Sequence, residues 1–400
     1  MANKEEADKK YPRYLVIGGV VLGLIAIFAL LIFRLGNIMP GLSSGEHSFY
    51  SLKLGWHGIY NNPLNLPVYS LWSAVFKFLA PVSQFWLRFP AALTGGLTII
   101  AFYILLLIWY GPRTAIFGSI LFATSAWTLH VSRIADLNVE YLAAMTFFLL
   151  STAILQKKLD GRYVYWLINL AWGLLLYVPG MVFFIGYNLF RQHKEVGFGM
   201  AKQTNFVSKI LYVLSAVLWV PLIGRYLIRN PKNILNWLGL PHHFASPLHI
   251  LKEFVAVFYH IFIHGPLLPS LWLDRLPILD IFSVITVLIG GYFYLKHLKA
   301  TRTHLLAVSL AIGALLIALG GAVSLSVVMP IIYILVAAGL AYLLSQWLGI
   351  FPSNPIARSV GYILISLAVA ISVIYNVRAY FVAWPHNNNS VSAFVYQPKR

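Results

Sequence analysis

Long apolar segments recur along almost the whole chain, and they constrain its fold more than any other feature. A window of about 17 to 25 apolar residues is the length that an α-helix needs to cross a bilayer. Hydrophobic residues make up 60% of the sequence and charged residues only 10%, whereas a soluble domain carries about 25% charged residues. The sequence therefore predicts an all-α polytopic membrane protein with about eleven transmembrane helices, in segments 13–33, 88–110, 114–131, 139–156, 163–178, 180–191, 207–228, 278–296, 304–322, 328–346 and 359–381.

Two parts of this pattern leave the number of spans open. Segments 163–178 and 180–191 are short and are separated by Pro179-Gly180, so they form either two spans or a helical hairpin that does not cross twice. In segment 249–264, charged residues and histidines interrupt apolar residues at helical spacing, which favours a helix on the membrane surface.

The basic residues predict an orientation. The formal net charge of +18 comes from 29 Lys and Arg against 11 Asp and Glu. These cations are scattered beside apolar segments, where they set topology and contact membrane lipids. The sequence contains neither a basic helix nor an aromatic–basic platform, so a nucleic-acid partner is not expected. A cytoplasmic N-terminus places more than half of the 29 in the shorter, cytoplasmic loops. We therefore expect a multi-pass cell-membrane protein with a transmembrane domain 1–381, outer loops 34–88 and 229–277, and an outward-facing tail 382–400.

The first outer loop, 34–88, is the richest polar segment of the chain. Within it, 45–57 and 67–79 carry apolar residues at helical spacing, so two amphipathic helices are expected along the membrane surface. Helices in this position enclose a groove at the level of the lipid headgroups.

Three carboxylates beside apolar segments on the outer side are candidate catalytic residues. A carboxylate at a membrane edge is costly unless it is solvated, paired or functional, and Glu46, Asp136 and Glu140 each lie at such an edge. Arg133 offers an alternative for the last two, because it can pair with either across one helical turn. Glu46 has no basic residue within four positions, so it is either an unpaired functional acid or a first-turn helix acid after Ser43 and Ser44.

Metal-binding patterns are weak in this sequence. The chain has no cysteine, which excludes disulfides, thiolate nucleophiles and cysteine-based metal sites. His260 and His264 have the i, i+4 spacing of a zinc-binding pair, but no carboxylate or cysteine completes a site at ligand spacing. We therefore predict no metal site.

Several short motifs resemble those of a known group of membrane enzymes. They are Leu87-Arg88-Phe89-Pro90-Ala91-Ala92-Leu93-Thr94-Gly95, Ser125-Ala126-Trp127 with Ser132-Arg133, Leu176-Tyr177-Val178-Pro179-Gly180, and Leu276-Pro277-Ile278-Leu279-Asp280. In this order they resemble the GT-C glycosyltransferases of the protein mannosyltransferase and aminoarabinose transferase type, over roughly residues 12–300 of this chain. The chain departs from that pattern at Gly45-Glu46, where an Asp-Glu pair is usual. It departs again at Asn65-Leu66-Pro67-Val68-Tyr69, where many relatives have Lys-Pro-Pro-Leu-Tyr.

The resemblance implies an inverting transfer of sugar from a polyprenyl-phosphate donor to a glycan, lipid or protein acceptor on the extracytoplasmic side. No cofactor is implied, since the lipid-linked sugar is itself a substrate. This chemistry requires a base for the acceptor proton and cations for the departing phosphate. Glu46 is the expected base, with Asp136 and Glu140 as further acids. The expected substrate- and phosphate-binding residues are Arg133, Lys53, His57, Tyr69 and Arg88.

Other functions compete with this interpretation. A lipid-linked polysaccharide ligase or polymerase uses similar outer-loop chemistry. A transporter or flippase predicts buried charges near span centres and an internal repeat, neither of which the sequence shows. A scaffold role follows if the departure at Gly45 has silenced the enzyme.

Overall fold

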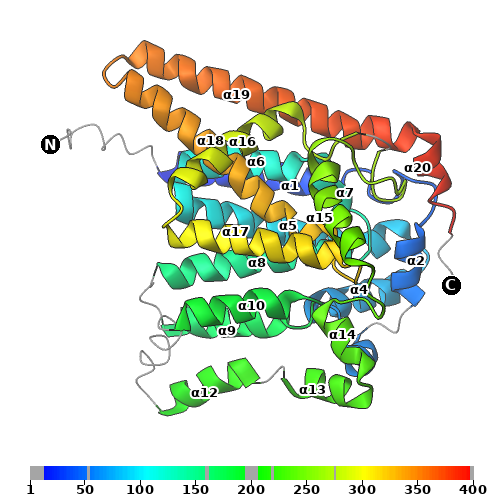
Figure 1. The fold of residues 1–400 in the computed structure, drawn as a ribbon. Coiled ribbons are helices and arrows are strands. Elements are labelled where there is room, and N and C mark those ends of the chain that lie inside the picture. The colour runs from blue at the N-terminus through cyan, green and yellow to red at the C-terminus, as the bar shows by residue number, and fades with distance from the viewer. Residues whose placement is uncertain are drawn as a thin grey trace.

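The computed structural model describes residues 13–51, 55–157, 162–193, 206–217, 220–273 and 276–396. Within these ranges the secondary structure is helical, apart from one antiparallel bridge between Leu42 and Tyr396. Long helices lie side by side as a bundle, with the start of α1 at one end and α20 at the other (Figure 1). We call the end that carries α20 the tail end, and the other the N-terminal end.

The long helices follow the predicted apolar segments closely. Their bounds are α1 Arg13–Ile32, α5 Gln84–Tyr110, α6 Pro112–Thr124, α8 Asn138–Gln156, α9 Arg162–Leu175, α10 Met181–Arg191, α12 Phe206–Val217, α13 Val220–Arg229, α16 Ile281–Lys296, α17 Thr301–Ala318, α18 Met329–Ile350 and α19 Pro355–Arg378. Shorter elements connect them: α2 Ser44–Ser51, α3 Trp56–Asn61, α4 Pro67–Leu79, α7 Ala126–Val131, α14 Lys232–Leu238, α15 Pro247–Phe262, η2 Leu325–Val327, η3 Ala379–Ala383, η4 Trp384–His386 and α20 Asn388–Ser392.

The expected count of eleven transmembrane helices is not confirmed. Six helical stretches are long and apolar enough to cross a membrane: Gln84–Tyr110, Asn138–Gln156, Lys209–Arg229, Thr301–Ala318, Leu325–Ile350 and Pro355–His386. Shorter apolar helices occupy Leu22–Ile32, Val164–Leu175 and Ile281–Lys296. These counts refer to the described residues.

Two predicted segments correspond to two helices each: 207–228 to α12 and α13, and 114–131 to α6 and α7. The segment 114–131 breaks at Ser125, where α6 ends and α7 begins. The Ser125 hydroxyl accepts a hydrogen bond from the Thr128 backbone N–H at 3.1 Å, which caps α7 and makes the break favourable. The turn after this short helix carries Arg133 and Asp136 toward the start of α8.

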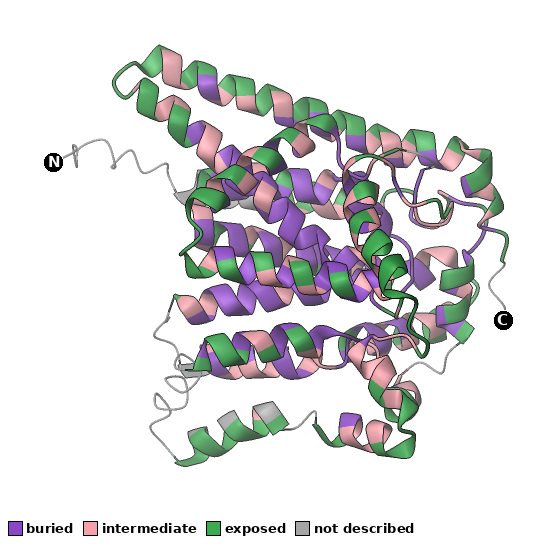
Figure 2. Cartoon of the chain, in the orientation of Figure 1, coloured by how far each residue is buried: buried purple, intermediate pink, exposed green. Residues whose placement is uncertain are grey.

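The core forms where central helices approach closely. A Cβ atom on Gly290 of α16 would lie 2.0 Å from the Leu335 carbonyl oxygen of α18, and one on Gly339 would lie 2.0 Å from the Thr286 oxygen. Small residues allow such approach of membrane helices, where packing rather than the hydrophobic effect drives association. Buried residues concentrate in these central helices, while the outer helices α12 and α19 are largely exposed (Figure 2).

The first outer loop folds into three helices at the tail end. The expected helix over 67–79 is confirmed as α4, but the expected helix over 45–57 is two, α2 and α3, which flank the undescribed residues 52–54. Gly55 precedes α3 with φ of 75°, a conformation that L side chains rarely adopt. The tail folds back on this loop, because Leu42 pairs with Tyr396 and the Phe394 side chain is buried.

Candidate active site

Glu46 lies in the first turn of α2 and takes part in a reciprocal cap. The Ser43 backbone N–H donates to Glu46 Oε2 at 2.8 Å, and the Glu46 N–H donates to Ser43 Oγ at 3.2 Å. This is a capping box, which satisfies two backbone donors that the helix itself cannot use. The first-turn interpretation of Glu46 is therefore correct.

The expectation that Glu46 is unpaired is wrong. Its carboxylate forms a two-point ion pair with Arg88, with Nε at 2.7 Å from Oε1 and Nη2 at 3.0 Å from Oε2. Both side chains are buried, and the Ala135 N–H donates to Oε1 at 3.2 Å. Arg88 also donates to the carbonyl of Gly41 at 2.8 Å. This ion pair joins the first outer loop, α5 and the turn before α8, and N–H donors occupy both oxygens of the Glu46 carboxylate.

Asp136 lies in the turn between α7 and α8, next to this ion pair. Its carboxylate accepts hydrogen bonds from the Asn138 backbone at 2.8 Å and from the Asn138 side-chain amide at 2.6 Å. Burial raises the pKa of Asp136 from 3.8 to about 7, the Asn138 bonds oppose this rise, and the negative charge of Glu46 adds to it. An aspartate with this pKa can accept a proton near neutral pH.

Gly45 faces Asp136 directly. A Cβ atom on Gly45 would lie 3.8 Å from Asp136 Cβ and 3.9 Å from Asp136 Oδ2. Gly45 replaces the first acid of the usual Asp-Glu pair. In this structure the carboxyl group of Asp136 therefore lies beside that position.

Glu140 and Tyr69 extend the same cluster. Glu140 lies in the first turn of α8, where Oε2 accepts from the Leu66 N–H at 2.7 Å. Its other oxygen and the Tyr69 hydroxyl are both buried without a hydrogen-bond partner within the described structure. Burial raises the pKa of Tyr69, and the nearby negative charges, including Asp136, Glu140 and Glu46, raise it further. Two unsatisfied polar atoms thus remain beside the acids, and each would gain from a polar ligand.

The sequence allowed Arg133 to pair with Asp136 or Glu140, but in the structure it pairs with neither. It donates to the carbonyl oxygens of Leu30 at 2.6 Å and Phe33 at 2.5 Å, and its guanidinium lies 4.5 Å from the centre of the Phe381 ring. It therefore links the end of α1 to η3, the short helix that follows α19. Of the other expected phosphate ligands, Lys53 lies outside the described residues, as does the side chain of His57.

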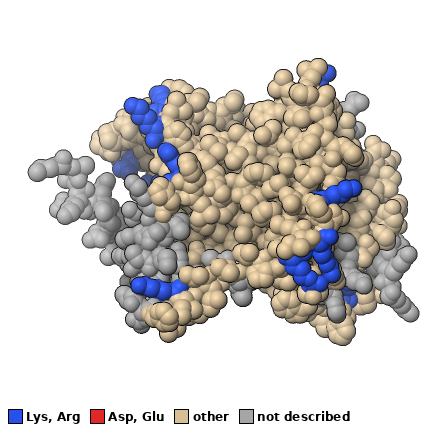
Figure 3. All heavy atoms as spheres, turned by 60° about the horizontal axis from the view of Figure 1, so that its bottom comes forward, with Lys and Arg blue, Asp and Glu red and all other residues tan. Residues whose placement is uncertain are grey.

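Two arginines of α13, which no sequence motif singled out, reach the first outer loop. Arg225 lies over the Tyr60 ring at 3.3 Å, and Arg229 donates to Asn61 Oδ1 at 3.4 Å. Nη1 of Arg225 is buried without a hydrogen-bond partner in the described part of the chain. Lys and Arg atoms, and no Asp or Glu atoms, are visible on the face that Figure 3 shows. The amphipathic pattern of 220–229 was the available signal, but it was included in a predicted span.

Asp136 and Glu140 do not line either of two cavities that the described residues form. One of about 530 Å³ lies near the tail end, between the loop 36–40, Gln84 and the C-terminal tail. The other, of about 700 Å³, lies at the N-terminal end. The described residues contain no group of three or more His, Asp or Glu arranged to hold a metal ion. His260 Nδ1 instead lies 2.8 Å from the carbonyl oxygen of His264.

Comparison with known proteins identifies the fold. No protein-family model and no curated protein matches the sequence. Among solved structures, ArnT from Cupriavidus metallidurans in the apo state matches 94% of this chain and 77% of its own, with a TM-score of 0.56 and 12% identity. The chain has a GT-C fold. The resemblance seen in the sequence motifs is thus confirmed for the fold.

Two further structures agree with this fold. ArnT bound to undecaprenyl phosphate covers 94% of the chain with a TM-score of 0.51 and 14% identity. The Archaeoglobus fulgidus oligosaccharyltransferase tethered with an acceptor peptide covers 95%, with a TM-score of 0.51 and 14% identity. This chain spans about half the length of that archaeal enzyme, at 56%, and 77% of ArnT.

Proposed function

We propose that this GT-C protein is an integral-membrane glycosyltransferase that moves a sugar from a polyprenyl-phosphate donor to an acceptor hydroxyl or amine. The observation that carries the proposal is the buried cluster of Glu46, Asp136 and Glu140 at the tail end of a GT-C fold. A buried carboxyl with a pKa of about 7, as at Asp136, suits a general base at neutral pH.

The three acids take different roles in this proposal. Asp136 accepts the acceptor's proton as the acceptor oxygen or nitrogen attacks the anomeric carbon. The bond from that carbon to the donor phosphate oxygen breaks, and the lipid phosphate leaves. One displacement of this kind inverts the anomeric carbon. Glu140, with its free Oε1, orients the acceptor, while Glu46 is a positioning residue that acts through Arg88 and the Ala135 backbone.

The departing phosphate requires positive charge, and Arg225 and Arg229 are the proposed source. Arg229 donates to Asn61, and five residues later the Leu66 N–H donates to Glu140. These contacts connect the arginines of α13 to the acid cluster through one short segment of the first loop. Arginine binds phosphate oxygens in two-point fashion, which suits this role.

The substrate class is proposed from the solved structures of the same fold. ArnT has been solved with undecaprenyl phosphate, and the archaeal oligosaccharyltransferase with dolichol-phosphate and an inhibitory peptide. Polyprenyl-phosphate sugars are therefore the first donors to test, with glycan, lipid and peptide acceptors.

The decisive experiment measures transfer of labelled sugar from polyprenyl-phosphate donors by the purified protein in lipid nanodiscs. Removing a general base lowers the rate by roughly 10²–10⁴-fold, so Asp136→Asn should lose nearly all turnover. The matched control is Glu253→Gln, because Glu253 is an exposed acid on α15 that lies beside His249. Equal turnover by wild type and Asp136→Asn would remove Asp136 as the base.

A catalytically inactive scaffold is the second candidate. Two observations favour it: Glu46 is held in an ion pair with Arg88, and position 45 is a glycine rather than an acid. Wild-type protein that binds a polyprenyl phosphate but transfers no sugar to any class of acceptor would support the scaffold. Restoring an acid with Gly45→Asp then tests whether the missing acid is the cause.

A further inference from the structure

The larger cavity lies at the opposite end of the bundle from the acid cluster. Its wall includes the C-terminal end of α5, whose other end carries Arg88 and so contacts Glu46. The 27 residues of α5 span about 40 Å at 1.5 Å per residue. Any ligand of this cavity of about 700 Å³ is therefore distinct from a substrate at the acids.

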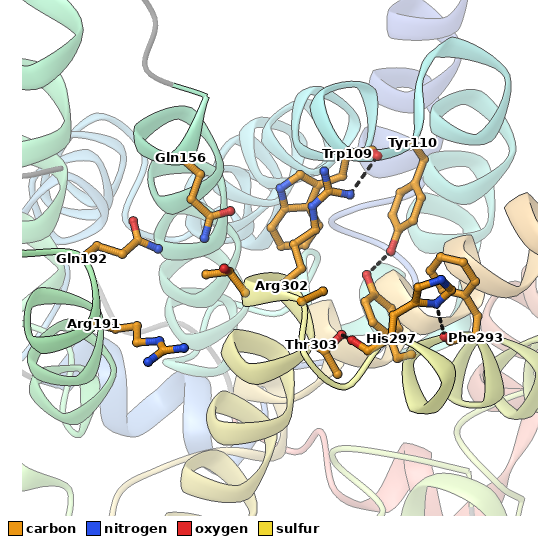
Figure 4. A pocket seen from close by; sticks show the side chains of 12 residues that line it. Trp109, Tyr110, Gln156, Arg191, Gln192, Phe293, His297, Arg302 and Thr303 are labelled. Carbon is orange, nitrogen blue, oxygen red and sulfur yellow. Dashed lines mark hydrogen bonds between the residues drawn. The ribbon is translucent and has the colours of Figure 1, made fainter. Parts of the chain in front are cut away.

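The cavity is basic. Arg191, His297 and Arg302 line it, and its twelve lining residues include no Asp or Glu. Arg191 is exposed at the end of α10, and its side chain makes no hydrogen bond or ion pair within the described part of the chain. Arg302 uses Nη1 to donate to the Trp109 carbonyl at 3.0 Å, which holds the guanidinium over the cavity and leaves other N–H groups for a ligand (Figure 4).

Unpartnered amides face the same space. Gln192 is 3% exposed, yet its Oε1 has no hydrogen-bond partner in the described structure, and neither has the buried Nε2 of Gln156. Figure 4 shows both amides and Arg191 on one side of the cavity, with Arg302 and Trp109 across from them. Leaving buried polar atoms unsatisfied is costly, so a ligand that accepts from Gln156 Nε2 and donates to Gln192 Oε1 would recover that free energy.

A helix N-terminus completes the site. The 18-residue α17 begins with Thr301, Arg302 and Thr303, all of which line the cavity. The first N–H groups of a helix have no partner within it, and the helix dipole adds positive potential there. A helix start combined with arginines is an arrangement that binds phosphate.

We propose that this cavity is a second anion site that binds a phosphate group, held by Arg191, Arg302 and the start of α17. Gln156 Nε2 donates to a phosphate oxygen, and Gln192 Oε1 accepts from a hydroxyl of the same ligand. The phosphate comes either from a lipid headgroup or from a soluble phosphate compound. This site is independent of the proposed transferase activity, because it is assigned from its own residues at the other end of the bundle.

The test titrates full-length protein in detergent with dioctanoyl phosphatidic acid, with inorganic pyrophosphate, and with dioctanoyl phosphatidylcholine as a zwitterionic control whose phosphate is a diester without net headgroup charge. Binding is measured by calorimetry and by the shift in the thermal unfolding midpoint. Arg191→Gln should weaken binding about ten-fold, as expected for the loss of one charge-assisted hydrogen bond. Arg302→Gln should do the same. Arg113→Gln is the matched control, because Arg113 lies at the same end on α6 but bonds to Tyr362 outside the cavity.

The two sources give different results. A lipid headgroup predicts binding of phosphatidic acid that pyrophosphate does not displace, and a soluble phosphate predicts that pyrophosphate binds and competes. Because Arg302→Gln also removes the bond to the Trp109 carbonyl, Arg191→Gln decides the question without disturbing that contact. The proposal is overturned if neither ligand binds the wild type, or if Arg191→Gln and Arg113→Gln bind alike.

Discussion

Glu46 and Asp136 are neighbouring buried carboxylates, but their surroundings give them opposite properties. Four N–H donors, two of them from Arg88, stabilise the charge of Glu46. Burial raises the pKa of Asp136, and the negative charge of Glu46 raises it further. Its hydrogen bonds come from Asn138, which carries no positive charge to offset this rise. One carboxylate is therefore suited to hold the structure together, and the other to exchange a proton.

Activity should depend on the ionisation of Asp136. A base acts in its deprotonated form, so kcat/KM should rise with pH through an apparent pKa of about 7, the value of Asp136 in the folded protein. A pH profile of sugar transfer by the wild type measures this. The rise should be absent from the residual activity of Asp136→Asn, and an unchanged profile in that variant would contradict the assignment.

The same pKa predicts a pH dependence of stability. The folded state binds the Asp136 proton more tightly than the unfolded state, so stability falls as pH increases from about 4 through about 7. Asp136→Asn lacks this term, so the variant should gain in melting temperature relative to wild type at pH 8 compared with pH 4. Thermal unfolding at the two pH values checks this, and a parallel response of the two proteins would count against a raised pKa.

Breaking the buried ion pair should destabilise the protein strongly. Glu46→Gln or Arg88→Met leaves one charge buried without its partner, which costs about 3–5 kcal/mol. The double variant should lose less than the sum of the two, because it leaves neither charge behind. Melting temperatures of the four proteins form the test, with Glu253→Gln as a surface control. Additive losses would show that the two groups do not interact.

Helices α16 and α18 are held together by shape rather than by polar contacts at Gly290 and Gly339. Each glycine brings its backbone against a carbonyl of the other helix, so a methyl group has no space there. At the adjacent Gly291, a Cβ atom would have no other atom within 4 Å, so the chain contains its own comparison.

We expect Gly290→Ala to lower the stability of the bundle and Gly291→Ala to leave it unchanged or raise it slightly. Overpacking costs typically about 1–3 kcal/mol, whereas alanine favours a helix over glycine by about 1 kcal/mol. Thermal unfolding of both variants in the same detergent measures the difference. Equal melting temperatures would show that α16 and α18 do not pack as closely as described.

The bundle carries its two candidate sites at opposite ends, and the orientation in the membrane decides which one faces the cytoplasm. The acid cluster lies at the tail end with α2 and α4, and the basic cavity at the other end. The positive-inside rule predicts that the tail end faces outward.

The absence of cysteine makes this orientation directly testable. Ser51→Cys at the end of α2 and Ser353→Cys in the turn before α19 place exposed thiols at opposite ends of the bundle. In intact cells, a membrane-impermeant maleimide should label Ser51→Cys at once and Ser353→Cys only after the membrane is opened. The reverse order would place the acid cluster in the cytoplasm and contradict the proposed topology.

Helices were predictable from this sequence because their signals are local. Runs of apolar residues identified the long helices, and α4 was predicted with its observed bounds because apolar residues at helical spacing follow Pro67. Breaks were harder, since the one at Ser125 depends on a single side-chain cap inside an apolar segment.

The partners of the buried charged residues could not be predicted from local sequence patterns. Arg88 is 42 residues from Glu46, and Arg229 of α13 reaches Asn61 of the first loop from 168 residues away. No local pattern encodes these pairings, because they arise when helices pack.

Apolar composition and periodicity were sufficient to establish a helical membrane protein, the positions of most helices and the acids worth testing, because each follows from neighbouring residues and the bilayer's length requirement. Packing determined which acid is neutralised by Arg88, which one acquires a pKa near 7, and that a basic cavity forms at the far end. Ionisation and binding depend on the groups that surround a side chain in space, and those groups are distant in the chain.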